Sequence, residues 1–220
     1  MKYTGIIRKW VFLLFLPTFY IYSQVDLGAD LVSRYIWRGQ DFGNSASIQP
    51  DISYSIRSFT IGVWGSYAFT ASGAGFNEND LYISYSFDPF IFSFIDYYYP
   101  ENNNLFEIYP DSGYHVLELD LAYIYHKFNL LCTVNLLGDL NGQLKSRNSV
   151  YAEIRYLILH TDEVEAHLFA GAGNEVYVST DDGNFTLINL GITVHKERYN
   201  LSYIINPELE TSFLVFGITF

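Results

Sequence analysis

The chain has 220 residues, of which 50% are hydrophobic, 19% are aromatic and only 16% are charged. Globular proteins carry about 25% charged residues, so this composition argues against an ordinary soluble domain. The formal net charge of −12 excludes a nucleic-acid-binding protein, because such proteins need basic surfaces.

Residues 1–24 have the three-part organisation of a secretory signal peptide. Three cationic residues precede the apolar run 10–22, and the polar pair Ser23 and Gln24 follows it. The run is interrupted by Pro17 and is too short for a membrane-spanning helix, which needs about 20 residues. We therefore expect cleavage near Ser23 or Gln24, which would leave 9 Lys and Arg against 24 Asp and Glu, a formal charge of −15.

The segment from Ser45 to Phe69 has the clearest strand pattern in the chain. Its first half alternates fully between an apolar face and a polar face, and the pattern resumes after a tight turn at Arg57 and Ser58. A strand of about 11 residues with this alternation needs an apolar medium on one side and water on the other. The apolar face carries Ala46, Ile48, Pro50, Ile52, Tyr54 and Ile56, and the polar face carries Ser47, Gln49, Asp51, Ser53, Ser55 and Arg57.

Similar alternation recurs along the rest of the chain. The connections between these segments are alternately short turns and long polar loops. The pattern predicts an all-β fold, a single antiparallel transmembrane β-barrel of about twelve strands over residues 25–220, with the short turns on the periplasmic side of a bacterial outer membrane. The predicted strands are 26–37, 45–57, 59–70, 78–87, 90–99, 114–125, 128–138, 148–159, 165–173, 185–194, 198–205 and 212–220.

The main competing fold is a secreted soluble β-sandwich or lipocalin-like barrel, whose strands also alternate. Such a fold turns its apolar face toward a core of limited volume. Here nearly every strand would deliver Tyr, Phe, Leu and Ile to that one core, and little charge would remain to cover the outside. The membrane barrel is therefore favoured, and we expect its apolar face to contact outer-membrane lipid.

Two single residues support this interpretation. Phe220 ends an alternating strand, and this position resembles the C-terminal signature of outer-membrane proteins, which implies the barrel assembly machinery as a partner. Cys132 is the single cysteine and lies in the apolar phase of its strand, so we interpret it as a small lipid-facing side chain without a disulfide.

If the apolar face meets lipid, the opposite face lines a lumen. Ionisable groups at membrane depth are tolerated where they face water or one another. An acidic lining with a few arginines would favour cations, whereas the same groups could equally form a salt-bridged plug that fills the lumen. The candidate lumen residues are Arg34, Arg38, Asp51, Glu78, Asp80, Asp96, Glu118, Asp120, Glu153 and Arg155.

Catalytic and metal sites are weakly supported. His115 is a candidate base in the lipid-facing phase, but Ser93 is the only nearby serine and has no matching position for a triad. The five histidines show no metal-ligand spacing. We therefore expect no enzyme, no cofactor and no metal.

The segment from Leu31 to Asp80, with a short motif beyond it, resembles the TorF family of Gram-negative outer-membrane porins. This resemblance implies a barrel with a pore role and supplies no catalytic residues. The matching motifs are Ser33-Arg34-Tyr35-Ile36-Trp37-Arg38-Gly39, Ser47-Ile48-Gln49-Pro50, Gly62-Val63-Trp64-Gly65-Ser66, Asn79-Asp80-Leu81 and Asp96-Tyr97-Tyr98-Tyr99-Pro100.

The sequence therefore predicts a porin-like barrel for passive diffusion of small solutes, with a preference for cations. One alternative is a closed structural or adhesive barrel that binds a partner through its long loops. A second is a lipid-modifying outer-membrane enzyme that depends on His115.

Overall fold

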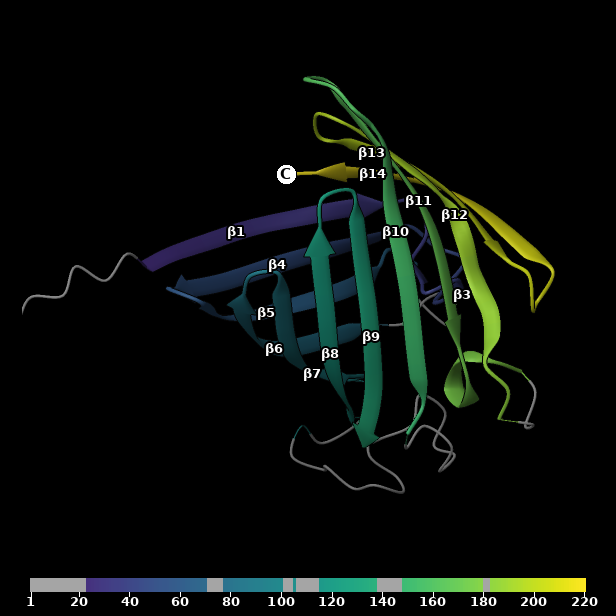
Figure 1. Cartoon of the computed structure of the whole chain (residues 1–220), viewed down its shortest axis with the longest axis horizontal. Helices are drawn as coiled ribbons and strands as arrows, with labels where there is room; N and C mark the ends of the chain where they lie inside the picture. Colours follow the sequence, from purple (N-terminus) through teal and green to yellow (C-terminus); the bar gives the residue numbers. More distant parts are fainter. Residues whose placement is uncertain (1–22, 71–76, 101–104, 106–114, 138–147, 180–182) are drawn as a thin grey trace, which may run out of the picture.

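The computed structural model describes residues 23–70, 77–100, 105, 115–137, 148–179 and 183–220. Twelve antiparallel strands form one closed barrel, as the sequence predicts. Each strand pairs with its neighbour in the chain, and β1 closes the ring against the last strand (Figure 1). The strands are β1 (Ser23–Val32), β4 (Ser47–Ile56), β5 (Phe59–Ala68), β6 (Glu78–Phe87), β7 (Phe90–Tyr98), β8 (His115–Tyr125), β9 (Phe128–Leu137), β10 (Val150–His160), β11 (Val164–Gly173), β12 (Thr186–Lys196), β13 (Tyr199–Asn206) and β14 (Thr211–Thr219).

Three short elements stand outside the barrel wall. The strands β2 (Ile36–Trp37) and β3 (Gln40–Asp41) pair with each other in a separate two-stranded sheet. A single turn of 3₁₀ helix, η2 (Glu175–Tyr177), follows β11. Within the described ranges, no helix is both long enough and apolar enough to cross a bilayer.

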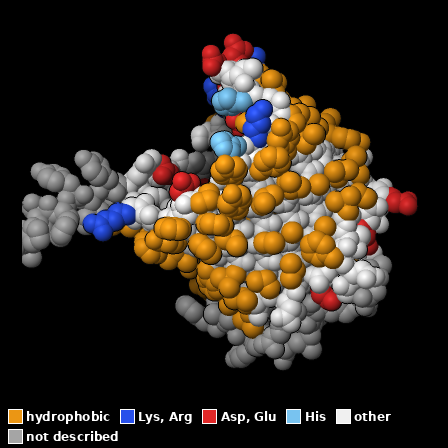
Figure 2. Space-filling model, viewed as in Figure 1, with side chains coloured by type: hydrophobic (Ala, Val, Ile, Leu, Met, Phe, Trp, Pro, Cys, Tyr) orange, Lys and Arg blue, Asp and Glu red, His pale blue; other side chains and the backbone are white. Residues whose placement is uncertain are grey.

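The outer face of the wall carries the apolar side chains that the alternation predicts. Leu27 is 79% exposed, Ile52 is 50% exposed and Cys132 is also exposed. Figure 2 shows these side chains as a nearly continuous apolar surface over the strands. A soluble β-sandwich would bury these groups, so the structure favours the barrel that faces an apolar medium.

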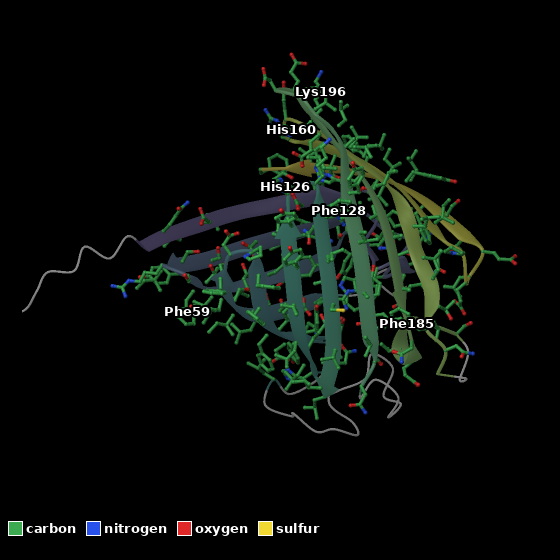
Figure 3. All side chains as sticks on the ribbon, in the orientation of Figure 1. Phe59, His126, Phe128, His160, Phe185 and Lys196 are labelled. Carbon is green, nitrogen blue, oxygen red and sulfur yellow. The ribbon has the colours of Figure 1, made fainter. Side chains whose placement is uncertain are left out.

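The two ends of the barrel differ. His126, His160 and Lys196 lie at the end that carries the short turns, whereas Phe185 lies at the end that carries the long connections (Figure 3). The predicted signal peptide lies outside the described residues except for its last two, Ser23 and Gln24, which begin β1.

The seam between β1 and β14 is the shortest pairing in the ring. Only three residue pairs, from Asp30 with Thr219 to Val32 with Gly217, lie in register there, whereas the other neighbouring barrel strands share at least seven. Two backbone bonds extend it, from Ser33 to Phe216 and from Phe220 to Ala29. β1 pairs with β4 along its full length from Ser23, whereas its register with β14 begins only at Asp30. No described strand therefore pairs with the other side of the beginning of β1.

Candidate functional site

The long-loop half of the lumen is occupied by part of the connection between β1 and β4. We call residues 35–42, which contain β2 and β3, the plug hairpin. Its side chains and backbone contact inward-facing residues of strands that lie far apart around the ring, including Glu78 of β6, Glu118 of β8 and Asn206 of β13. The lumen at this level is therefore filled by the chain itself.

Arg38 at the tip of the plug hairpin forms the central contact. Its two terminal nitrogens donate to the two carboxylate oxygens of Glu118, at 2.5 and 2.8 Å. The Arg38 side chain is 8% exposed and that of Glu118 is fully buried. Such a two-point pairing fixes geometry as well as charge, so the plug hairpin is held in one position against β8.

Aromatic groups enclose this ion pair. The guanidinium of Arg38 lies 4.3 Å from the ring centre of Trp37 and 4.8 Å from that of Tyr151. The hydroxyls of Tyr97 and Tyr177 both donate to Glu118, at 2.7 and 3.0 Å. The carboxylate thus receives four donors in all, which offsets the cost of removing it from water.

Gly39 allows the tip of the plug hairpin to press against the wall. Its φ of +79° is in the left-handed region, and a β-carbon at this position would lie 2.1 Å from the carbonyl oxygen of Ile188. The Gly39 carbonyl accepts a hydrogen bond from the side-chain amide of Asn206 at 3.2 Å. Only glycine fits a position with both constraints.

A second acidic group lies beside the plug hairpin. The hydroxyls of Tyr35 and Tyr99 donate to Glu78, each at 2.9 Å. Asp80 and Asp120 also face inward, and each has one buried carboxylate oxygen without a hydrogen-bond partner. Among the described residues, the inner faces of β6 and β8 thus carry four carboxylates, those of Glu78, Asp80, Glu118 and Asp120, and the guanidinium of Arg38 pairs with one of them.

The structure corrects the prediction that Arg34 and Arg38 line the lumen as part of the wall. β1 ends at Val32, so neither residue lines the wall. Arg34 pairs with Asp41 of the plug hairpin and lies over the ring of Phe213. The hydrogen bond to Asp41 raises the pKa of the Arg34 guanidinium.

The structure also corrects the predicted phase of the strand 90–99. Asp96 shares its face with the exposed rings of Phe92 and Phe94, whereas Tyr97 reaches inward to Glu118. Asp96 therefore lies on the outer side of β7. Ser93, which pairs inward with Ser84 at 3.0 Å, is the better marker of the inner face.

Asp96 meets His115 on this outer side. The imidazole Nδ1 lies 2.8 and 3.0 Å from the two Asp96 oxygens, Nε2 lies 3.0 Å from the Leu105 carbonyl, and Tyr98 stacks on the ring. Both ring nitrogens thus face acceptors. Among the described residues no hydroxyl is bonded to His115, so the pair has the base and orienter of a triad but no nucleophile.

The remaining predicted residues face the lumen. Asp51 accepts a hydrogen bond from Tyr82 at 3.0 Å. Glu153 accepts hydrogen bonds from Tyr151 at 2.6 Å and from Arg155 at 3.0 Å. Glu153 and Arg155 border a cavity of about 480 Å³ that extends from the plug hairpin along β10–β13 toward the short-turn end.

Sequence reasoning missed the plug hairpin and Tyr177. The sequence predicts a loop between the strands 26–37 and 45–57, and alternation carries no information about whether a loop folds outward or into the lumen. Among the described residues there is no cluster of three or more His, Cys, Asp or Glu side chains placed to hold a metal ion.

Comparison with known proteins places most of the chain in one family. Residues 23–205 match a family model described as a bacterial protein of unknown function, Gcw_chp. No curated protein matches the chain. The matched range contains the plug hairpin and all of the lumen carboxylates described above.

Proposed function

The chain belongs to the Gcw_chp family of bacterial proteins of unknown function, and from this starting point we propose that it is an outer-membrane diffusion channel that rests closed. In this proposal the barrel wall is the pore, small solutes are the cargo, and the plug hairpin is the closing element. The observation that carries it is the Arg38–Glu118 ion pair, which is buried between the plug hairpin and β8 in the long-loop half of the lumen.

Three features support the location in an outer membrane. The outer wall is an apolar band, residues 1–24 have the pattern of a signal peptide, and the sequence resembles the TorF-type porins. Phe220 would serve the barrel assembly machinery during insertion. A wall of this kind is stable only where hydrocarbon covers it.

The contacts of the plug hairpin favour a plug that can move over one that fills the lumen permanently. Apolar side chains of similar volume often fill a buried space with equal or greater stability than an ion pair does. Here the filling is held by one guanidinium and by hydroxyl and amide hydrogen bonds, together with ring contacts such as that of Trp37 with Tyr97. Water can replace each of the polar contacts if the hairpin moves.

The open state would prefer cations. Withdrawal of Arg38 would remove the one guanidinium that the described residues place beside Glu118, and Glu78, Asp80, Glu118 and Asp120 would stay behind on the wall. A ring of carboxylates in a pore attracts cations and repels anions. Twelve strands give a lumen wider than that of the eight-stranded barrels that side chains fill, and narrower than that of the 16-stranded porins.

Planar-bilayer recording tests the channel. Replacement of residues 35–42 by a Gly-Ser linker of equal length should convert rare, small openings into a steady conductance with a cation-selective reversal potential. Asp80→Asn combined with Asp120→Asn in the same background should reduce that selectivity. An equal replacement of the exposed turn 161–163 serves as the control and should leave the conductance as in the unaltered protein.

A silent bilayer after verified insertion of the barrel without its plug hairpin would overturn the channel. It would favour the closed structural or adhesive barrel. We propose no catalytic activity, since the Nε2 atom of His115 faces a backbone carbonyl.

A further inference from the structure

The lumen cavity below the plug hairpin has three kinds of wall. It is lined by charged groups from Asp30, Glu153 and Arg155, by neutral polar groups that include Asn200, and by apolar groups that include Phe169 and Ile204. Its volume of about 480 Å³ is at the lower end of the range of small-molecule sites. Nothing in the proposed passive diffusion requires such a combination.

Arg155 is the cation that this cavity offers to a ligand. Its side chain is 38% exposed, against 8% for Arg38, and its guanidinium lies 5.4 Å from the ring centre of Phe169. One of its nitrogens donates to Glu153 at 3.0 Å. A guanidinium has five N–H donors, so donors remain for a carboxylate that enters the cavity.

Asp30 is the matching anion. One of its oxygens accepts the hydroxyl of Thr219 at 2.6 Å, and the other has no hydrogen bond to a described residue. The Glu153 oxygen that meets Arg155 accepts no other donor among the described residues. Both carboxylates can therefore accept from an ammonium group. Two arginines line the cavity, and Arg38 is already paired with Glu118. Arg155 is therefore the guanidinium that remains for a ligand, and the two carboxylates of Asp30 and Glu153 outnumber it.

The apolar part of the wall is continuous. Phe169 and Ile204 belong to one buried cluster with Val215, and Ile36 of the plug hairpin packs against it. A ligand that fits this lining needs a carboxylate, an ammonium group and an apolar side chain. We propose that the cavity binds a small zwitterion of this type, a free α-amino acid with an apolar side chain. This inference deepens the proposed function and rests on it for the biological role, but the binding itself does not require conduction.

Trp37 lines the same cavity and can report binding. The chain has three Trp residues, so the variant Trp10→Phe/Trp64→Phe leaves Trp37 as the only one, whether or not the signal peptide is removed. In nanodiscs, leucine should change the Trp37 emission in a saturable way. Two analogues each lack one charge: 4-methylpentanoate lacks the amine and 3-methylbutylamine lacks the carboxylate. We expect each to bind at least tenfold more weakly than leucine.

Variants separate the two contacts. Arg155→Gln should abolish the response to leucine, and Arg155→Lys should retain part of it. Asp30→Asn should weaken the binding of leucine to the affinity of 4-methylpentanoate and should leave the affinity for that analogue unchanged. Arg57→Gln, at the exposed turn between β4 and β5, is the matched control and should bind leucine normally. Circular dichroism and heat-modifiable migration on gels check that each variant folds.

Equal Trp37 responses to leucine and to either analogue would contradict the proposal that the ligand is a zwitterion. An unchanged response to leucine in folded Arg155→Gln would contradict the proposed binding site. Absence of any saturable response would do the same. These results are independent of the conductance of the barrel without its plug hairpin, so failure of the site and failure of the channel are distinguishable.

Discussion

At the scale of single residues, the ion pair between Arg38 and Glu118 holds the plug hairpin in the lumen and so keeps the lumen closed. Removal of one partner leaves the other charge buried without compensation, which typically costs about 3–5 kcal/mol. The carboxylate would lose two of its four donors, and the aromatic groups of Trp37 and Tyr177 could not replace them. The ion pair is therefore the contact whose loss should both destabilise and open the barrel.

We predict that Arg38→Ala lowers the free energy of unfolding by ~3–5 kcal/mol and raises the open probability in planar bilayers. Urea titration in lipid vesicles and single-channel recording measure the two effects. The double variant Arg38→Met/Glu118→Leu should recover most of the stability, because no buried charge remains. Arg57→Ala, at an exposed turn, should stay within about 0.5 kcal/mol of the unaltered protein. Equal stability of Arg38→Ala and Arg57→Ala would contradict the role of the ion pair.

At the scale of elements, Gly39 sets how closely the plug hairpin approaches β12. A side chain there would meet the Ile188 carbonyl, and the left-handed backbone adds strain of about 1–3 kcal/mol. The hairpin cannot keep its position if this residue gains a β-carbon.

We predict that Gly39→Ala displaces the plug hairpin and increases conductance without loss of the barrel. Bilayer recording measures the conductance, and circular dichroism checks the strands. Gly28→Ala on β1 is the matched control, since a β-carbon there would only touch the Phe220 carbonyl oxygen at 3.4 Å. If both variants conduct alike, the tight fit at Gly39 does not hold the plug.

The seam between β1 and β14 is an element with its own test. Leu31 and Ile218 are direct partners across it, and facing pairs on neighbouring strands lie within about 4.5–5.5 Å, which suits a disulfide. In a Cys132→Ser background, Leu31→Cys/Ile218→Cys should cross-link on mild oxidation and give a faster band on a denaturing gel. Leu31→Cys/Leu214→Cys, four residues further along β14, should not. Equal yields for the two pairs would mean that the seam is not fixed in this register.

The strands themselves could be predicted from the sequence, and the occupancy of the lumen could not. Alternation along residues 45–69 fixes which side chains share a face, because a one-residue slip would turn the whole strand over. The prediction for Asp96 is wrong because an acidic residue in a barrel strand favours the lumen face, whereas Phe92 and Phe94 on the same face are exposed outward and Ser93 points inward. The plug hairpin depends on contacts with strands distant in the chain, such as Arg38 with Glu118, and no local pattern encodes such contacts.

At the scale of the whole molecule, the apolar band predicts how the barrel responds to charge. Ile52 and Ser53 are neighbours in the middle of β4 and point to opposite sides of the wall. Arginine on the lipid side at membrane mid-depth costs about 2–4 kcal/mol, whereas lumen positions are more tolerant.

We predict that Ile52→Arg lowers the free energy of unfolding in lipid vesicles by ~2–4 kcal/mol and that Ser53→Arg lowers it by less than half as much. Urea titration measures both. The reverse order would mean that the apolar side of β4 faces a protein interior, and the membrane assignment would be lost with it.

The plug hairpin also joins opposite parts of the ring. It is bonded to Glu78 on β6, to Glu118 on β8 and to Asn206 on β13, so it works as a cross-tie that keeps the cross-section from flattening. Release of the hairpin would therefore soften the wall, and amide exchange should accelerate on these three strands together. Opening of the lumen and loosening of the barrel wall would then occur together.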